Sequence, residues 1–142
     1  MKHITVYEEI AEHAEALIER AQWRRRDQLD ELDRLEKRRA EIEKEISDAV
    51  RALECCMFDP SEQASAEKLI RFIDTAGEQT AGIRAKIDKI SSKKAIRRSE
   101  YREAKQALNV IRQYDPDEYR AQAEELEELR KPAGAIRRND QQ

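Results

Sequence analysis

Few side chains in this sequence have the types and spacing that chemistry requires. Of two histidines, only His13 has a second possible ligand, Glu9, at the four-residue spacing that puts both on one helix face. A zinc site needs three or four protein ligands, so this pair predicts no metal site. Three glycines in 142 residues leave no room for a glycine-rich phosphate loop. We therefore expect no enzyme, no metal and no cofactor.

Two basic stretches, far apart in the sequence, are candidates for binding a partner. We call them together the cationic belt: Arg24, Arg25, Arg26, Lys93, Lys94, Arg97 and Arg98. If the chain folds back near Pro60, the two stretches meet and bring like charges together, which lowers stability. Residues that lower stability are often found at functional sites. Two interpretations stay open: a surface that binds an anion or an acidic protein, or a solvated face that weakens the helix pair locally. With a net charge of −3, nucleic acid is a less expected ligand.

Two adjacent thiols, Cys55 and Cys56, lie near the predicted turn. Neighbouring residues on a helix point about 100° apart, so these two are badly placed to bridge each other. They are either reduced thiols, with Cys56 packed between the helices, or the site of an intermolecular disulfide that joins two copies.

Three large apolar residues are further candidates for partner binding. Trp23 lies off the main apolar stripe, so it either packs against a third helix or a second copy, or is an exposed anchor for a partner. Met57 and Phe58 either close the end of the helix pair or form an apolar docking point at its tip.

An apolar pattern that occurs twice in the sequence predicts the helices that carry these residues. On both sides of the Asp59-Pro60-Ser61-Glu62 break, apolar residues recur at alternating spacings of three and four. This heptad repeat keeps one stripe of a helix facing a partner helix. The first stripe runs over residues 18–56 and the second over 66–111, so the sequence predicts two long helices that pair in antiparallel order.

Capping signals set the predicted boundaries. Thr5 and Glu8 form a capping box, and Pro60 and Pro116 each follow an aspartate that can cap a helix. The predicted helices are therefore 6–58, 60–114 and 116–130. The predicted fold class is all-α: a long antiparallel two-helix coiled-coil hairpin with a short third helix, in one domain over residues 1–130, followed by a flexible C-terminal tail over 131–142. Whether the third helix packs on its own molecule or on another subunit stays open.

Composition narrows the function classes. Charged residues make up 42% of the chain and hydrophobic residues 39%, so apolar surface is confined to one stripe per helix and a further chain is needed to stabilise the pair. We expect a non-enzymatic structural or adaptor protein that assembles with other protein subunits or with itself, as a scaffold, a virion or secretion-machine component, or a stalk. The alternative is a regulatory module that captures an acidic protein or nucleic acid through the cationic belt. The absence of a signal segment or membrane-length apolar run predicts the cytoplasm, or a particle assembled there.

Overall fold

The structure is a computed structural model that describes residues 2–56 and 59–141, with side chains described for residues 6–56 and 59–137. Apart from one isolated backbone bridge, the regular structure of these residues is helical. The helices are α1 (Lys2–Cys56), η1 (Pro60–Glu62, a short 3₁₀ helix), α2 (Gln63–Ser91), α3 (Arg98–Tyr114), α4 (Pro116–Leu129) and α5 (Ala133–Gln141). The predicted all-α class, with two long helices packed against each other, is confirmed.

The chain divides into two compact units that share α1. The hairpin unit comprises residues 31–89, and the bundle unit comprises residues 1–30 together with 90–142. The single domain over residues 1–130 stays a prediction.

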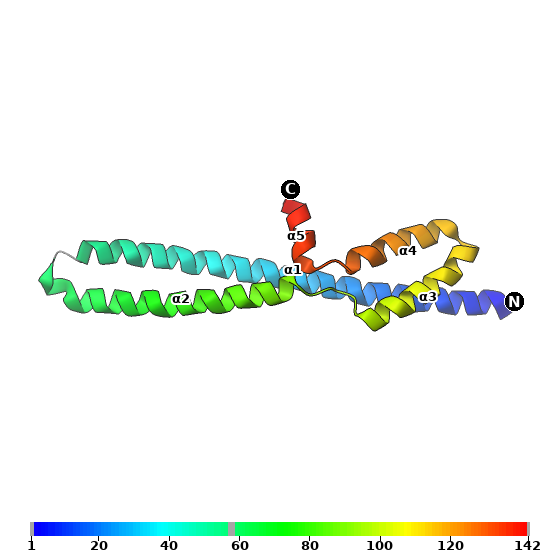
Figure 1. Cartoon of the computed structure of the whole chain (residues 1–142), viewed down its shortest axis with the longest axis horizontal. Helices are drawn as coiled ribbons and strands as arrows, with labels where there is room; N and C mark the ends of the chain where they lie inside the picture. Colours follow the sequence, from blue (N-terminus) through cyan, green and yellow to red (C-terminus); the bar gives the residue numbers. More distant parts are fainter. Residues whose placement is uncertain (1, 57–58, 142) are drawn as a thin grey trace. The chain divides into compact units, whose positions relative to one another are not determined.

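In the hairpin unit, the second part of α1 and α2 run antiparallel, side by side (Figure 1). The buried residues of this unit all stand at predicted heptad positions, and they are Leu32, Leu35, Ile42, Ala49, Ala76 and Ile87. The remaining predicted positions of this unit, among them Ile46, Leu53 and Ile73, are half-buried. The heptad pattern is therefore confirmed here, and these positions form what we call the seam of the hairpin.

The turn between the two long helices uses the predicted capping residues with a different geometry. The Asp59 carboxylate accepts hydrogen bonds from the Ser61 hydroxyl (2.7 Å) and from the Ser61 backbone N–H (3.0 Å). Both hydrogen bonds lower the pKa of Asp59 because they stabilise its charged form, and the bond from the hydroxyl has the larger effect. Pro60 opens η1 rather than α2, so α2 starts at Gln63, later than the predicted residue 60.

The prediction of one continuous helix over residues 60–114 is wrong at residues 92–97. This segment leaves the helix and runs beside the segment that follows α4. The Ile96 N–H donates to the Leu129 carbonyl (3.3 Å), and the Ala133 N–H donates to the Lys93 carbonyl (3.0 Å). The break also buries Ala95 and Ile96 in the bundle core. Neither proline nor glycine marks the position, so tertiary packing overrides local helix propensity.

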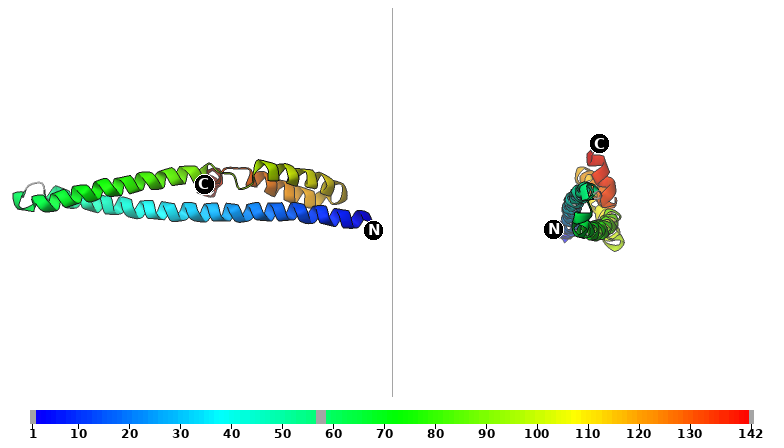
Figure 2. Two further views of the ribbon diagram at one scale, coloured as in Figure 1. Left: turned by 90° about the horizontal axis from the view of Figure 1, so that it is seen from below. Right: turned by 90° about the vertical axis from the view of Figure 1, so that its left-hand side faces the viewer.

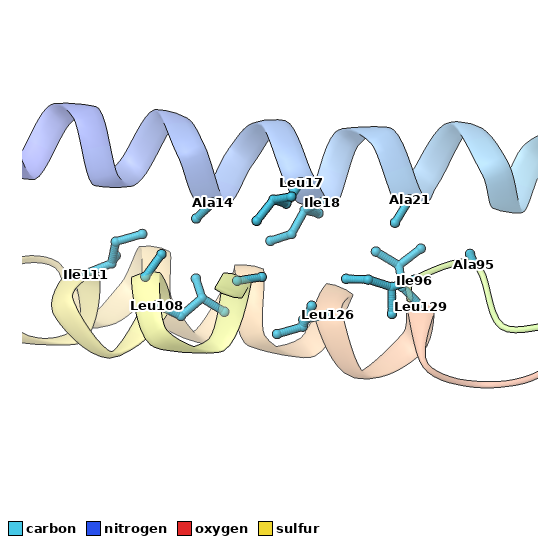
Figure 3. Close-up of a cluster of buried hydrophobic side chains, with 12 residues drawn as sticks. Ala14, Leu17, Ile18, Ala21, Ala95, Ile96, Leu108, Ile111, Leu126 and Leu129 are labelled. Atoms are coloured by element: carbon cyan, nitrogen blue, oxygen red, sulfur yellow. The ribbon is translucent and has the colours of Figure 1, made fainter. Parts of the chain in front are cut away.

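In the bundle unit, α3 and α4 run antiparallel along the same side of the first part of α1 (Figure 2). The Asp115 carboxylate accepts a hydrogen bond from the Glu118 N–H (3.2 Å), and Pro116 opens α4, as predicted. The buried core, shown in Figure 3, consists of Ala14, Leu17, Ile18, Ala21, Ala95, Ile96, Ala104, Ala107, Leu108, Ile111, Leu126 and Leu129. The third predicted helix therefore packs on its own molecule.

Both ends of the chain contain more helix than predicted. α1 begins at Lys2 rather than at residue 6. The predicted tail over residues 131–142 contains α5, which the sequence patterns did not indicate. Ala133, at the start of α5, is buried, so the bundle unit extends beyond α4.

Candidate functional site

The two halves of the cationic belt lie close together, and several of their cations bind a carboxylate or backbone carbonyls. Arg24 Nη1 donates to both carboxylate oxygens of Glu100, at 2.8 and 3.1 Å, and to the Ala95 carbonyl at 3.3 Å. Arg97 Nε lies 3.6 Å from the same Glu100 carboxylate, which is largely buried. One glutamate that we did not single out in the sequence thus pairs with an arginine from each half of the belt.

Arg25 is a buried structural residue, with only 7% of its surface exposed. Its Nη2 atom donates to the carbonyl oxygens of Glu128 (3.3 Å), Leu129 (3.1 Å) and Lys131. The Leu129 carbonyl also accepts from the Ile96 N–H (3.3 Å) and the Glu128 carbonyl from the Lys131 N–H (3.1 Å), so Arg25 adds a further donor at the end of α4. Burial lowers the pKa of the Arg25 guanidinium from its ordinary value, while the carboxylates of Glu128 and Glu125 oppose that shift. Arginine nevertheless stays protonated at neutral pH.

Trp23 and Arg26 line a groove between α1 and α4. The Arg26 guanidinium lies over the indole, 4.9 Å from the ring centroid, and Trp23 is 55% exposed. The groove has a volume of about 580 Å³, and its acidic lining residues are Glu15, Glu19, Glu118 and Glu125. Trp23 therefore stands beside the third predicted helix, now α4, and also presents its ring to solvent.

The remaining cations of the belt are exposed, and two of them share a second groove. Lys93 is exposed and takes part in the fold through its backbone carbonyl. Lys94 and Arg98 line a groove of about 530 Å³. We call it the basic groove, and its lining residues are Lys94, Ile96, Arg98, Tyr101, Arg102 and Arg130. Four cations thus surround an apolar residue and an aromatic residue.

Hydrogen bonds hold one side of the basic groove in place. The Tyr101 hydroxyl donates to Glu127 Oε1 (2.8 Å) and accepts from Arg130 Nη1 (3.2 Å). The Arg130 guanidinium also lies over the Tyr101 ring, 4.2 Å from its centroid. Arg102 and Arg130 were not among the predicted site residues. The spacing of Arg102 four residues after Arg98 places both on one helix face and was the signal that could have found Arg102.

The two cysteines at the tip of the hairpin unit are free thiols. Cys55 is exposed and Cys56 is half-buried. A hydrogen bond to the Glu62 carboxylate, with smaller contributions from burial and nearby charges, raises the pKa of the Cys56 thiol. The intermolecular disulfide stays a prediction. Met57 and Phe58 lie outside the described residues.

The His13 imidazole lies 3.4 Å from the Glu103 carboxylate, and both side chains are more than half exposed. Within residues 2–56 and 59–141, no three His, Cys, Asp or Glu side chains are grouped so that they could hold a metal ion. No helix in the same ranges has the length and apolar content to cross a membrane.

Comparison of the chain with protein-family models, with curated proteins and with solved structures finds no match.

Proposed function

We propose that this protein is a non-enzymatic coiled-coil adaptor that assembles with a second copy of itself through the hairpin unit. The observation that carries the proposal is apolar surface left beside the seam. Val50 is 39% exposed and Ile70 is 47% exposed, although both are large hydrophobic residues in long helices. A two-helix pair leaves such residues in water, and a further helix would cover them.

The two residues stand on the same side of the hairpin. Val50 directly follows the seam residue Ala49, and Ile70 directly follows the seam residue Leu69. Both are therefore at heptad position e, and in an antiparallel pair the e positions of the two helices flank the seam on one side. They extend the apolar stripe beyond what α1 and α2 bury against each other.

A second copy has the charge pattern to cover this side. In the hairpin unit, residues 31–56 of α1 are acidic on balance and residues 63–89 of α2 are basic on balance. In a twofold dimer each surface patch meets its own equivalent, so α1 of one copy can lie against α2 of the other and opposite charges face each other. The product is a four-helix bundle built from two hairpins.

Size-exclusion chromatography with light scattering tests the proposal on the full chain. We expect the wild type to be dimeric at micromolar concentration and the Val50→Lys/Ile70→Lys variant to be monomeric with its helical circular dichroism retained. Ala85→Lys is the matched control, because Ala85 is exposed at the outer heptad position of α2 and should leave the dimer intact. A wild type that stays monomeric at all concentrations would contradict self-assembly.

The alternative, capture of an acidic protein or nucleic acid by the whole cationic belt, is less favoured. Arg24, Arg25 and Arg97 already have partners within the molecule, so the seven cations do not offer one continuous surface. The particular role as a scaffold, a virion or secretion-machine component or a stalk, and the cytoplasmic location, stay predictions.

A further inference from the structure

Three of the four cations that line the basic groove are uncompensated, whereas Arg130 pairs with Glu127. Lys94, Arg98 and Arg102 form no ion pair within the described residues, and all three are exposed. Elsewhere in the belt, Arg24 and Arg97 share the Glu100 carboxylate. No acidic residue lines the groove, so its local charge is positive in a chain whose net charge is negative.

The groove is also built on ordered elements rather than on a loose surface. Lys94 and Ile96 belong to the segment that pairs with residues 129–133, and Ile96 is a core residue. The fourth cation, Arg130, is held by the Tyr101 hydroxyl and by Glu127 at 3.2 Å. Because these neighbours hold the Arg130 side chain and the backbone of the 94–96 segment, a ligand would find this side of the groove already ordered and lose less entropy on binding.

We infer that the basic groove docks an acidic peptide segment of a partner protein. Carboxylates of the peptide pair with Lys94, Arg98 and Arg102, and arginine guanidinium groups bind carboxylates through two parallel hydrogen bonds. An apolar side chain of the peptide packs on the half-buried Tyr101 ring. This inference goes beyond assembly through the hairpin unit, because every residue of the groove belongs to the bundle unit.

The surroundings of the groove favour a short acidic peptide over nucleic acid. A nucleic acid strand carries regularly spaced phosphates and needs a basic track that follows its backbone. Here the basic surface is a single groove of about 530 Å³. Past the groove, α4 carries Glu124, Glu127 and Glu128, so a strand longer than the groove meets no continuous basic track.

Fluorescence anisotropy on the full-length protein tests this inference. The probe is a fluorescein-labelled peptide that alternates Glu with Leu, and the matched probe replaces each Glu by Gln. We expect the Glu peptide to bind at low salt and to be released as salt rises, because exposed ion pairs are screened. The Gln peptide should not bind.

Variants locate the binding within the molecule. Arg98→Ser/Arg102→Ser should weaken binding about tenfold, which corresponds to about 1.4 kcal/mol. The matched control is Arg51→Ser/Arg71→Ser in the hairpin unit, which removes the same charge from exposed outer heptad positions and should leave the affinity unchanged. If the groove variant loses helical circular dichroism, Lys94→Gln replaces it, with an expected loss of a few-fold.

Three outcomes would overturn the inference. Equal weakening by the two double variants would mean that general charge attraction, and not the groove, binds the peptide. Equal affinity for the Glu and Gln peptides would exclude carboxylate recognition. Tighter binding of a labelled single-stranded oligonucleotide than of the Glu peptide, lost in the groove variant, would assign the groove to nucleic acid. None of these results depends on the oligomeric state of the hairpin unit.

Discussion

The same helix, α1, is covered in two different ways along its length. In the hairpin unit a single long helix, α2, lies against it, and many seam positions stay half-buried. In the bundle unit two short helices and the segment over residues 92–97 share the task, and Ala14, Ala21 and Ile111 are completely buried. The heptad pattern of α1 continues through both units. A heptad therefore tells which face of a helix is buried and leaves open how many helices bury it.

The largest expected effect compares one isoleucine from each unit. Ile111→Ala in the bundle core should lower the free energy of unfolding by about 2–5 kcal/mol, because it leaves a cavity at a fully buried site. Ile73→Ala in the seam should cost less, about 1–2 kcal/mol, because water already reaches this side chain. Urea unfolding followed by circular dichroism measures both. Equal losses would show that the two units are equally well packed.

The second comparison uses two arginines at the same heptad position of α1. Arg25→Met removes the donor to three carbonyls at the end of α4 and should cost about 1–3 kcal/mol. Arg39 is half-buried and pairs with Glu36 (3.1 Å) and Glu43 (3.6 Å) on its own helix. Such pairs contribute about 0–1 kcal/mol, so Arg39→Met should be neutral or stabilising, since it adds apolar surface to the seam.

The control for this pair is Arg26→Met, because Arg26 is exposed beside Arg25 and makes no contact with the α4 carbonyls. It should leave stability within about 0.5 kcal/mol of the wild type. Were Arg25→Met as stable as Arg26→Met, the carbonyl contacts would have no net effect on stability.

The two units also differ in how much of them the sequence predicts. In the hairpin unit the heptad identifies each buried residue, because both long helices follow one unbroken repeat. In the bundle unit it misses the break after Ser91, which is set by pairing with residues 129–133 far along the chain. Lys94 and Arg97 are consecutive polar residues in the predicted stripe, but so are Arg25 and Gln28, where α1 continues, so no local sign marks the break.

The candidate site, like the bundle unit, could be predicted only in part. The predicted fold-back near Pro60 brings the two basic stretches together, as the hydrogen bond from Arg24 to the Ala95 carbonyl shows. The sequence did not predict the role of residues 131–133. The Lys131 carbonyl accepts a hydrogen bond from Arg25, and the Ala133 N–H donates to the Lys93 carbonyl. This segment has no apolar repeat of its own, so a heptad pattern cannot predict the hydrogen bonds that it makes with the belt.

Replacing glycines by alanine should change stability by a smaller amount, with an increase in the hairpin unit and a decrease in the bundle unit. At Gly77 and Gly82 in α2 an added Cβ would meet nothing within 4 Å, so each change to alanine should stabilise the hairpin unit by about 1 kcal/mol. At Gly134 in α5 the added Cβ would lie 2.9 Å from Ser91 Cβ and 3.2 Å from the Ser91 carbonyl oxygen. Gly134→Ala should therefore lower the melting temperature, while Gly77→Ala raises it. A rise for both would show that α5 moves away from Ser91 at no cost.

The smallest effect concerns reactivity rather than stability. Because the hydrogen bond to Glu62 raises the pKa of Cys56, less of its thiol is ionised at neutral pH, and its alkylation should require higher pH. Measured on the Cys55→Ser background, Glu62→Gln should lower that pKa and speed alkylation of Cys56 at neutral pH a few-fold. Superimposable pH–rate profiles for the two proteins would rule out the hydrogen bond in solution.

The long sequence separation in the bundle core has a consequence for synthesis on the ribosome. Arg24 and its partner Ala95 are 71 residues apart, so the apolar face of Ala14, Leu17 and Ile18 emerges well before the helices that cover it. At a synthesis rate of roughly 5–20 residues per second, this apolar face of the nascent chain stays exposed to water for several seconds. We expect stalled chains that end near residue 90 to bind chaperones, and full-length chains to be released from them, which pull-down of ribosome-bound intermediates can measure.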